Sequence, residues 1–149
     1  MGVSLGMSLS EDKAADLRVK HLEMLQAIIT RMAGYGSSFK GYCITVVTAV
    51  CGFALTMHRP AVIMLAFLPL IAFAIADTQY LRTERRFRLL YDEIRTDDWK
   101  TMPTFAVSLK NAPKSSFWSA AFSWSILSFY TPLGIGVVIA IIGARWGNV

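Results

Sequence analysis

The chain is poor in charge and in cysteine. Of its 149 residues, 17% are charged and two are cysteines, Cys43 and Cys51. Intrinsic disorder requires a chain rich in charge and poor in apolar residues, and a small disulfide scaffold requires many cysteines, so both classes are excluded. Cys43 and Cys51 also lie more than two helical turns apart within one apolar run, too far to bond to each other.

The sequence also lacks the patterns that usually carry chemistry. The two histidines, His21 and His58, are far apart, so no cluster of thiolate and imidazole ligands forms a zinc site. Neither G-x-x-x-x-G-K-S/T nor G-x-G-x-x-G occurs, and the serines of residues 115–128 have no neighbouring base to activate them. We therefore expect no enzyme, no cofactor and no metal, and we expect His21 to be a packed residue on an apolar helix stripe.

Hydrophobic residues make up 54% of the chain and gather in three uncharged runs, 41–57, 61–76 and 115–144. The first two are at the short end of the roughly 17 to 25 residues that cross a bilayer, so each needs its flanking residues, the second as far as Tyr80. Only His58, Arg59 and Pro60 separate these runs. This spacing predicts a tight hairpin of two transmembrane helices, 41–57 and 61–80.

The third run is longer than a single perpendicular span. Wholly helical, it would extend about 45 Å, against a hydrocarbon core of about 30 Å. Pro132 predicts a kink or break near Phe129. For residues 116–145 we favour an aromatic, serine-rich entry segment lying partly in the membrane interface, followed by a span completed by residues 133–144, with a re-entrant hairpin as the alternative. The aromatic residues of this entry segment are Phe117, Trp118, Phe122 and Trp124.

Two helices are predicted beside the spans. Ser8 and Glu11 match a capping box, and the pattern that follows predicts an amphipathic helix over 10–33 that ends at Gly34 and Gly36. Residues 77–97 are expected to continue the second span as a helix, and 98–114 to form a loop. The 77–97 helix has a basic end near the membrane and an acidic far end that carries Asp92, Glu93, Asp97 and Asp98, and this dipolar arrangement is expected to dock on the N-terminal helix.

A basic cluster follows the second span, and its members are Arg82, Arg85, Arg86 and Arg88. Such a cluster either fixes the topology or attracts anionic lipid headgroups. Lysine and arginine are concentrated before residue 41 and within 77–114, so the positive-inside rule places both segments in the cytoplasm. The net charge of +5 is explained in this way, and no nucleic-acid partner is expected.

Small residues recur on one face of the first span and late in the third. These residues are Gly41, Thr45, Thr48, Gly52 and Thr56 in the first span and Gly136, Ala140 and Gly143 in the third. Such faces let helices approach closely, either within one chain or between copies, and in an oligomer the threonines could line a polar path. Asp77, at the membrane boundary, is the one ionisable residue near hydrocarbon, which disfavours coupled ion transport.

Two segments carry a resemblance to known proteins. HLEMLQAIITRMA, followed six residues later by KGY, and YLRTERRFRLLYDEIR after the second span are similar to a family of small, mostly uncharacterised bacterial membrane proteins. The layout of two close spans flanked by cytoplasmic helices resembles the SLATT class of two-transmembrane effectors, which accompany nucleotide-signalling and anti-phage systems. The third span departs from that pattern, and we expect no fused sensor or ligand domain.

Together these features predict an all-α integral membrane protein forming a single membrane domain over residues 1–149. The resemblance implies a homo-oligomeric effector of the bacterial inner membrane that forms a pore or perturbs the bilayer when it is triggered, with anti-phage defence as the expected context. The alternative is a non-catalytic anchor or adaptor whose helices recruit a cytoplasmic partner. The expected partners are the lipid bilayer and other copies of the chain.

Overall fold

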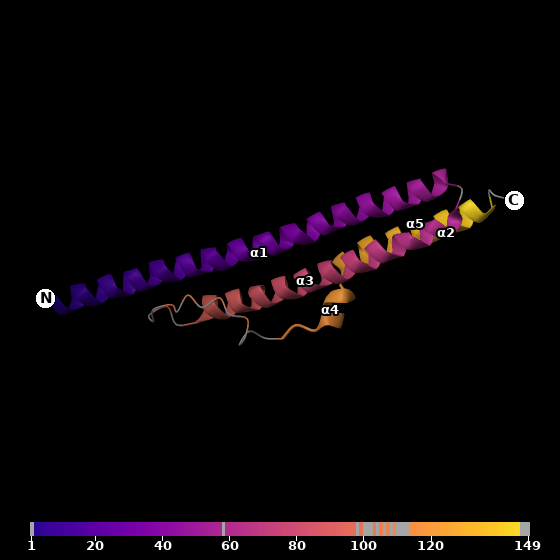
Figure 1. Cartoon of the computed structure of the whole chain (residues 1–149). Helices are drawn as coiled ribbons and strands as arrows, with labels where there is room; N and C mark the ends of the chain where they lie inside the picture. Colours follow the sequence, from indigo (N-terminus) through magenta and orange to yellow (C-terminus); the bar gives the residue numbers. More distant parts are fainter. Residues whose placement is uncertain are drawn as a thin grey trace. The chain divides into compact units, whose positions relative to one another are not determined.

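The computed structural model describes residues 2–57, 59–97, 99, 103, 105, 107, 109 and 114–146, and over these residues the regular structure is helical, without strands. This confirms the predicted all-α class. The elements, labelled in Figure 1, are α1 (Gly2–Thr56), α2 (Pro60–Ile63), the single 3-10 turn η1 (Met64–Ala66), α3 (Phe67–Thr96), α4 (Phe117–Ala121) and α5 (Trp124–Trp146). His58 and most of the predicted loop, including Asp98 and Pro113, lie outside the described residues.

Three helical stretches are long and apolar enough to cross a membrane. They are Glu11–Thr56, Ala61–Thr96 and Trp124–Trp146. The three candidate spans predicted from the apolar runs are therefore present. The continuation of the second span into the 77–97 segment is also confirmed, because α3 runs without interruption from Phe67 to Thr96.

The predicted helix end at Gly34 and Gly36 is wrong. The amphipathic segment and the first span form one helix, α1, which begins at Gly2, before the expected capping box at Ser8 and Glu11, and continues through both glycines to Thr56. A glycine inside a helix costs about 1 kcal/mol relative to alanine, which packing of the flanking turns can offset. Tyr35 and Phe39 supply such packing, since both contact the ring of Tyr80 on α3.

The break expected near Phe129 is also displaced. Pro132 lies inside α5, which is continuous from Trp124 to Trp146, and the chain turns instead between α4 and α5, at Phe122 and Ser123. Proline removes one backbone donor, and helices at membrane depth tolerate this loss when neighbouring helices support them. The separate entry segment preceding a third long helix is nevertheless observed, as α4.

The described chain divides into two compact units. The first comprises Met1–Met32 and Thr83–Lys114, and the second comprises Ala33–Arg82 and Ser115–Val149. In the first unit α1 and α3 run antiparallel around Leu25, Ile29 and Phe87. The buried guanidinium of Arg18 donates to Asp97 Oδ2 at 3.2 Å, which confirms the expected docking of that acidic end on the N-terminal helix.

His21 is buried in the first unit, as predicted for a packed residue on the apolar stripe. It is 2% exposed, and its ring lies 5.2 Å from that of Phe105.

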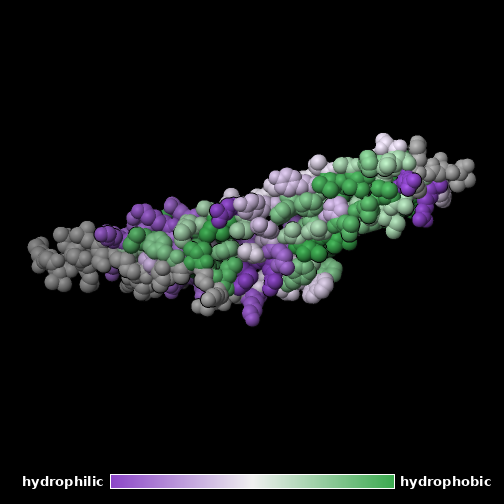
Figure 2. Space-filling model, in the orientation of Figure 1, coloured by the Kyte–Doolittle hydropathy of each residue, from purple (hydrophilic) through white to green (hydrophobic). Residues whose placement is uncertain are grey.

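The core of the second unit is formed by α1, α2, η1, α3 and α5. Its buried residues are Cys43, Val47, Ala54, Ile63, Ala66, Leu70, Ile126, Tyr130 and Val137. Large apolar side chains also cover much of the outside of these helices, for example Phe53 at 61% exposed, Leu68 at 67% and Ile139 at 63% (Figure 2). An apolar exterior around an apolar core is expected for helices that contact lipid.

Candidate functional site: a buried polar cluster

A cluster of three polar side chains lies inside the second unit, one from each long helix. Asp77 of α3 is 3% exposed, although an isolated buried carboxylate is strongly unfavourable. Lys40 Nζ of α1 donates to Asp77 Oδ2 at 2.5 Å, and the hydroxyl of Tyr130 on α5 lies 3.3 Å from the same oxygen. We call Lys40, Asp77 and Tyr130 the polar cluster. It joins residues 37 and 53 positions apart in the chain.

The two charges of the polar cluster are unequally buried. The Asp77 side chain is 4% exposed, whereas that of Lys40 is 22% exposed. Lys40 Nζ also lies 5.9 Å from the centroid of the Phe129 ring, within the range of a cation–π interaction. The Lys40 ammonium is therefore partly exposed and has a second favourable contact, with the Phe129 ring. The Asp77 carboxylate is buried and depends on its partners within the bundle.

Gly36 provides the space that the Asp77 carboxylate occupies. A Cβ placed on Gly36 would lie 2.9 Å from Asp77 Oδ1, closer than Cβ atoms normally approach any atom. The adjacent turn carries Gly34, where a Cβ would meet nothing within 4 Å. The two glycines predicted to end the helix thus differ in role, and Gly36 is a packing position.

Tyr130 connects the polar cluster to the backbone of α3. Its hydroxyl lies 3.3 Å from the carbonyl oxygen of Phe73, one turn before Asp77, so its single proton has two acceptors. Phe73 in turn contacts the Phe39 ring of α1. The polar cluster and these rings together hold α1, α3 and α5 in one register.

The polar cluster is an ion pair inside the bundle, with a tyrosine hydroxyl beside its carboxylate. Its formal charges cancel, and no group of three or more His, Cys, Asp or Glu residues that could hold a metal ion occurs in the described part of the chain. Ionisable side chains within membrane helices are costly, face the bundle interior and usually have a function. The polar cluster fits that description because each of its members faces another helix.

The small residues singled out in the sequence do not pack within the chain, except Ala140. A Cβ on Gly41, Gly52, Gly136 or Gly143 would meet nothing within 4 Å. The three threonines are exposed, and their hydroxyls donate to carbonyls of the same helix: Thr45 to Gly41, Thr48 to Ile44 and Thr56 to Phe53. Ala140 is half-buried against the core of the second unit. Gly134 of α5, in contrast, faces α3, because a Cβ there would lie 3.5 Å from Leu70 Cδ2, an ordinary van der Waals distance.

The arginine cluster predicted for topology or lipid binding makes several protein contacts. Arg82 Nε donates to the carbonyl oxygen of Ser115 at 2.7 Å, and Arg86 donates to the carbonyl oxygen of Leu109. Arg88 pairs with Glu84 one turn earlier at 2.7 Å, and Arg85 is half-buried. Arg82 and Arg86 therefore bind the chain that returns after α3, a role that the sequence analysis missed.

Asp77 stands out in the sequence, but its contacts with Lys40, Tyr130 and Gly36 were not predicted. A signal was available, since Lys40 ends the charged N-terminal region and Asp77 ends the second apolar run, so an antiparallel hairpin brings the two ends together. Tyr130 had no such signal, because the depth of α5 beside the hairpin depends on packing.

The chain was compared with known proteins, and no protein-family model, no curated protein and no solved structure matches it.

Proposed function

We propose that the protein is a homo-oligomeric effector of the bacterial inner membrane, with its N-terminus in the cytoplasm, that opens a pore or perturbs the bilayer when triggered. The observation that carries the proposal is the outward position of the small-residue faces of α1 and α5. Gly41, Gly52, Gly136 and Gly143 have open space where a side chain would be. Within a membrane, such positions are the usual places for close helix contact.

The threonines support the pore form of the proposal. Thr45 and Thr48 lie on the same face as Gly41 and Gly52, and their hydroxyls are exposed on the helix surface. In an oligomer built around this face, the threonines would supply hydrogen-bonding groups to a narrow polar path. The role in anti-phage defence follows from the resemblance to SLATT effectors alone.

The test is vesicle leakage by the full chain reconstituted at increasing protein-to-lipid ratios. We expect release of a trapped dye to rise steeply with that ratio, and we expect Gly52→Leu to lower both leakage and the subunit number seen by cross-linking. Val46→Phe, which adds bulk to an exposed α1 position outside the small-residue face, is the matched control and should leave both unchanged. Equal leakage from Gly52→Leu and the unaltered chain would refute the proposal.

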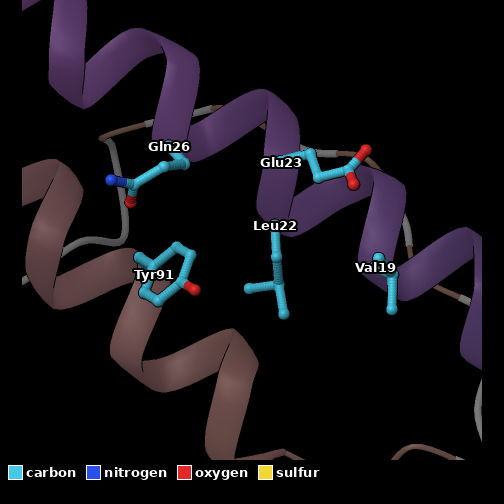
Figure 3. A pocket seen from close by; sticks show the side chains of 5 residues that line it. All are labelled: Val19, Leu22, Glu23, Gln26 and Tyr91. Atoms are coloured by element: carbon cyan, nitrogen blue, oxygen red, sulfur yellow. The ribbon is translucent and has the colours of Figure 1, made fainter.

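A second candidate function is an adaptor that recruits a cytoplasmic protein, and one observation in the first unit favours it. A groove of about 340 Å³ lies between α1 and α3, lined by Val19, Leu22, Glu23, Gln26 and Tyr91 (Figure 3). It could accept a helix that presents an apolar residue toward Leu22 and a basic one toward Glu23. This function predicts that unrelated hydrophobic helices can replace the spans without loss of activity, whereas the effector function predicts loss.

A further inference from the structure

The short helix α4 and the residue that follows it expose two aromatic side chains, Trp118 and Phe122, while Phe117 at the start of α4 is half-buried. Trp118 is 67% exposed and Phe122 68%, whereas Ala120, on the other side of the helix, is completely buried. The two aromatic rings stack one turn apart with centroids 6.1 Å apart, and Trp124, the first residue of α5, is 85% exposed. A helix that contacts water would bury the rings and expose the alanine, so this arrangement is suited to an apolar surrounding.

Contacts at both ends fix the position of this segment along α3. Before α4, the carbonyl of Ser115 accepts from Arg82 Nε at 2.7 Å, and after it the hydroxyl of Tyr130 reaches Asp77 at 3.3 Å. Arg82 and Asp77 are separated by only about 7.5 Å along their helix, at about 1.5 Å per residue. Ser115 and Tyr130 therefore contact α3 at nearly the same height along its axis. The helix α4 lies beside this part of α3 (Figure 1).

This height along α3 is close to the Trp124 end of α5, the third candidate span. Along α5, Trp124 and Trp146 stand about 33 Å apart, and both are strongly exposed, at 85% and 81%. A hydrocarbon core is about 30 Å thick, and tryptophan is enriched at both of its boundaries with the headgroups. The two tryptophans are spaced as such a pair, which places α4 outside the hydrocarbon at the Trp124 end.

We propose that α4 and the first turn of α5 form a lipid-binding surface whose aromatic residues insert at the boundary between headgroups and acyl chains. Trp118, Phe122 and Trp124 are the inserted residues. Lipid is the occupant because the surface continues directly into a candidate span and because an indole combines an apolar ring with an N–H that headgroups can accept. The surface anchors α5 at a fixed depth and so fixes the level of Tyr130.

The test measures tryptophan depth in vesicles by quenching with lipids brominated either near the headgroup or near the chain end. Full-length chains retain a single tryptophan, at position 118 or 124, with phenylalanine at the other three tryptophan positions. The depth reference is Ile139→Trp in a chain whose native tryptophans are all phenylalanine, because Ile139 is 63% exposed about 13 Å beyond Tyr130 along α5. We expect Trp118 and Trp124 to be quenched at least twofold more by the shallow bromines, and the indole of the Ile139→Trp reference chain by the deep ones.

Three results would overturn the proposal. Stronger quenching of Trp118 by deep bromines would mean a re-entrant segment. Quenching only by aqueous acrylamide would mean a surface in water, and protection from both quenchers would mean a surface covered by protein. If the single-tryptophan chains fail to insert, the unaltered chain is compared with one carrying only Ile139→Trp, and the unaltered chain must show the shallower profile.

Discussion

The unequal burial within the polar cluster predicts unequal costs when each charge is removed. In Lys40→Met, the Asp77 carboxylate, at 4% exposed, loses its only cation in the cluster, and breaking a buried pair in this way costs about 3 to 5 kcal/mol. In Asp77→Asn, the ammonium of Lys40, at 22% exposed, can turn outward and keeps the Phe129 ring beside it. Asparagine also preserves the volume and an acceptor for Tyr130, so we expect a cost of only about 1 to 2 kcal/mol.

The double variant separates pairing from packing. Once Asp77 is asparagine, Lys40→Met no longer strands a charge and should cost less than about 1 kcal/mol. The double-mutant cycle should therefore give a coupling of at least about 2 kcal/mol between the two positions, as expected for residues in one charged network.

The assay is equilibrium unfolding in mixed micelles by increasing sodium dodecyl sulfate, followed by circular dichroism. Lys20→Met is the control, because the Lys20–Asp16 pair is more than 60% exposed on both sides and should contribute no more than about 1 kcal/mol. The reasoning would be refuted if Asp77→Asn cost as much as Lys40→Met, or if the two costs simply added.

The same assay tests three further contacts. Gly36→Ala should destabilise the folded chain by about 1 to 3 kcal/mol, because the new Cβ would lie 2.9 Å from Asp77 Oδ1. Gly34→Ala, where a Cβ meets nothing within 4 Å, should instead stabilise it by up to about 1 kcal/mol. Equal effects of the two substitutions would contradict the packing role of Gly36. Tyr130→Phe should cost about 1 kcal/mol through the lost hydroxyl contacts, and no change would mean that the hydroxyl does not hold the cluster. Arg86→Gln should cost about 1 to 3 kcal/mol, since it frees a main-chain acceptor, whereas Arg95→Gln should stay within about 0.5 kcal/mol, because the side chains of the Arg95–Asp92 pair are 59% and 62% exposed; the reverse order would refute the loop-binding role.

The sequence predicted local features well and long-range partners poorly. The three candidate spans and the helix after the second span follow from uncharged runs and periodicity, which act over neighbouring residues. The continuity of α1 through Gly34 and Gly36 was not predictable in this way, because the intrinsic cost of glycine is offset by the contacts of Tyr35 and Phe39 with Tyr80. Tertiary packing there overrides local propensity.

The polar cluster shows the same difference between local features, which were predicted, and long-range partners, which were not. Asp77 stood out as a charge at the end of an apolar run, but its hydrogen bond with Tyr130 joins positions 53 residues apart. The small-residue faces were found from their spacing, yet only the three-dimensional arrangement shows that Gly41 and Gly52 point away from the core of their own chain. The spacing of small residues shows that they share one face of a helix, but it does not show what that face contacts.

The contact between Gly36 and Asp77 has a consequence for how this protein can change over evolution. A chain with an acid at position 77 can keep its carboxylate in place only while position 36 lacks a side chain. A lineage that replaced the acid with serine or alanine would be released from that restriction, and a larger residue could then spread at position 36. The two positions should therefore vary together among descendants of this sequence, whereas Gly34, two residues away, should vary independently of position 77.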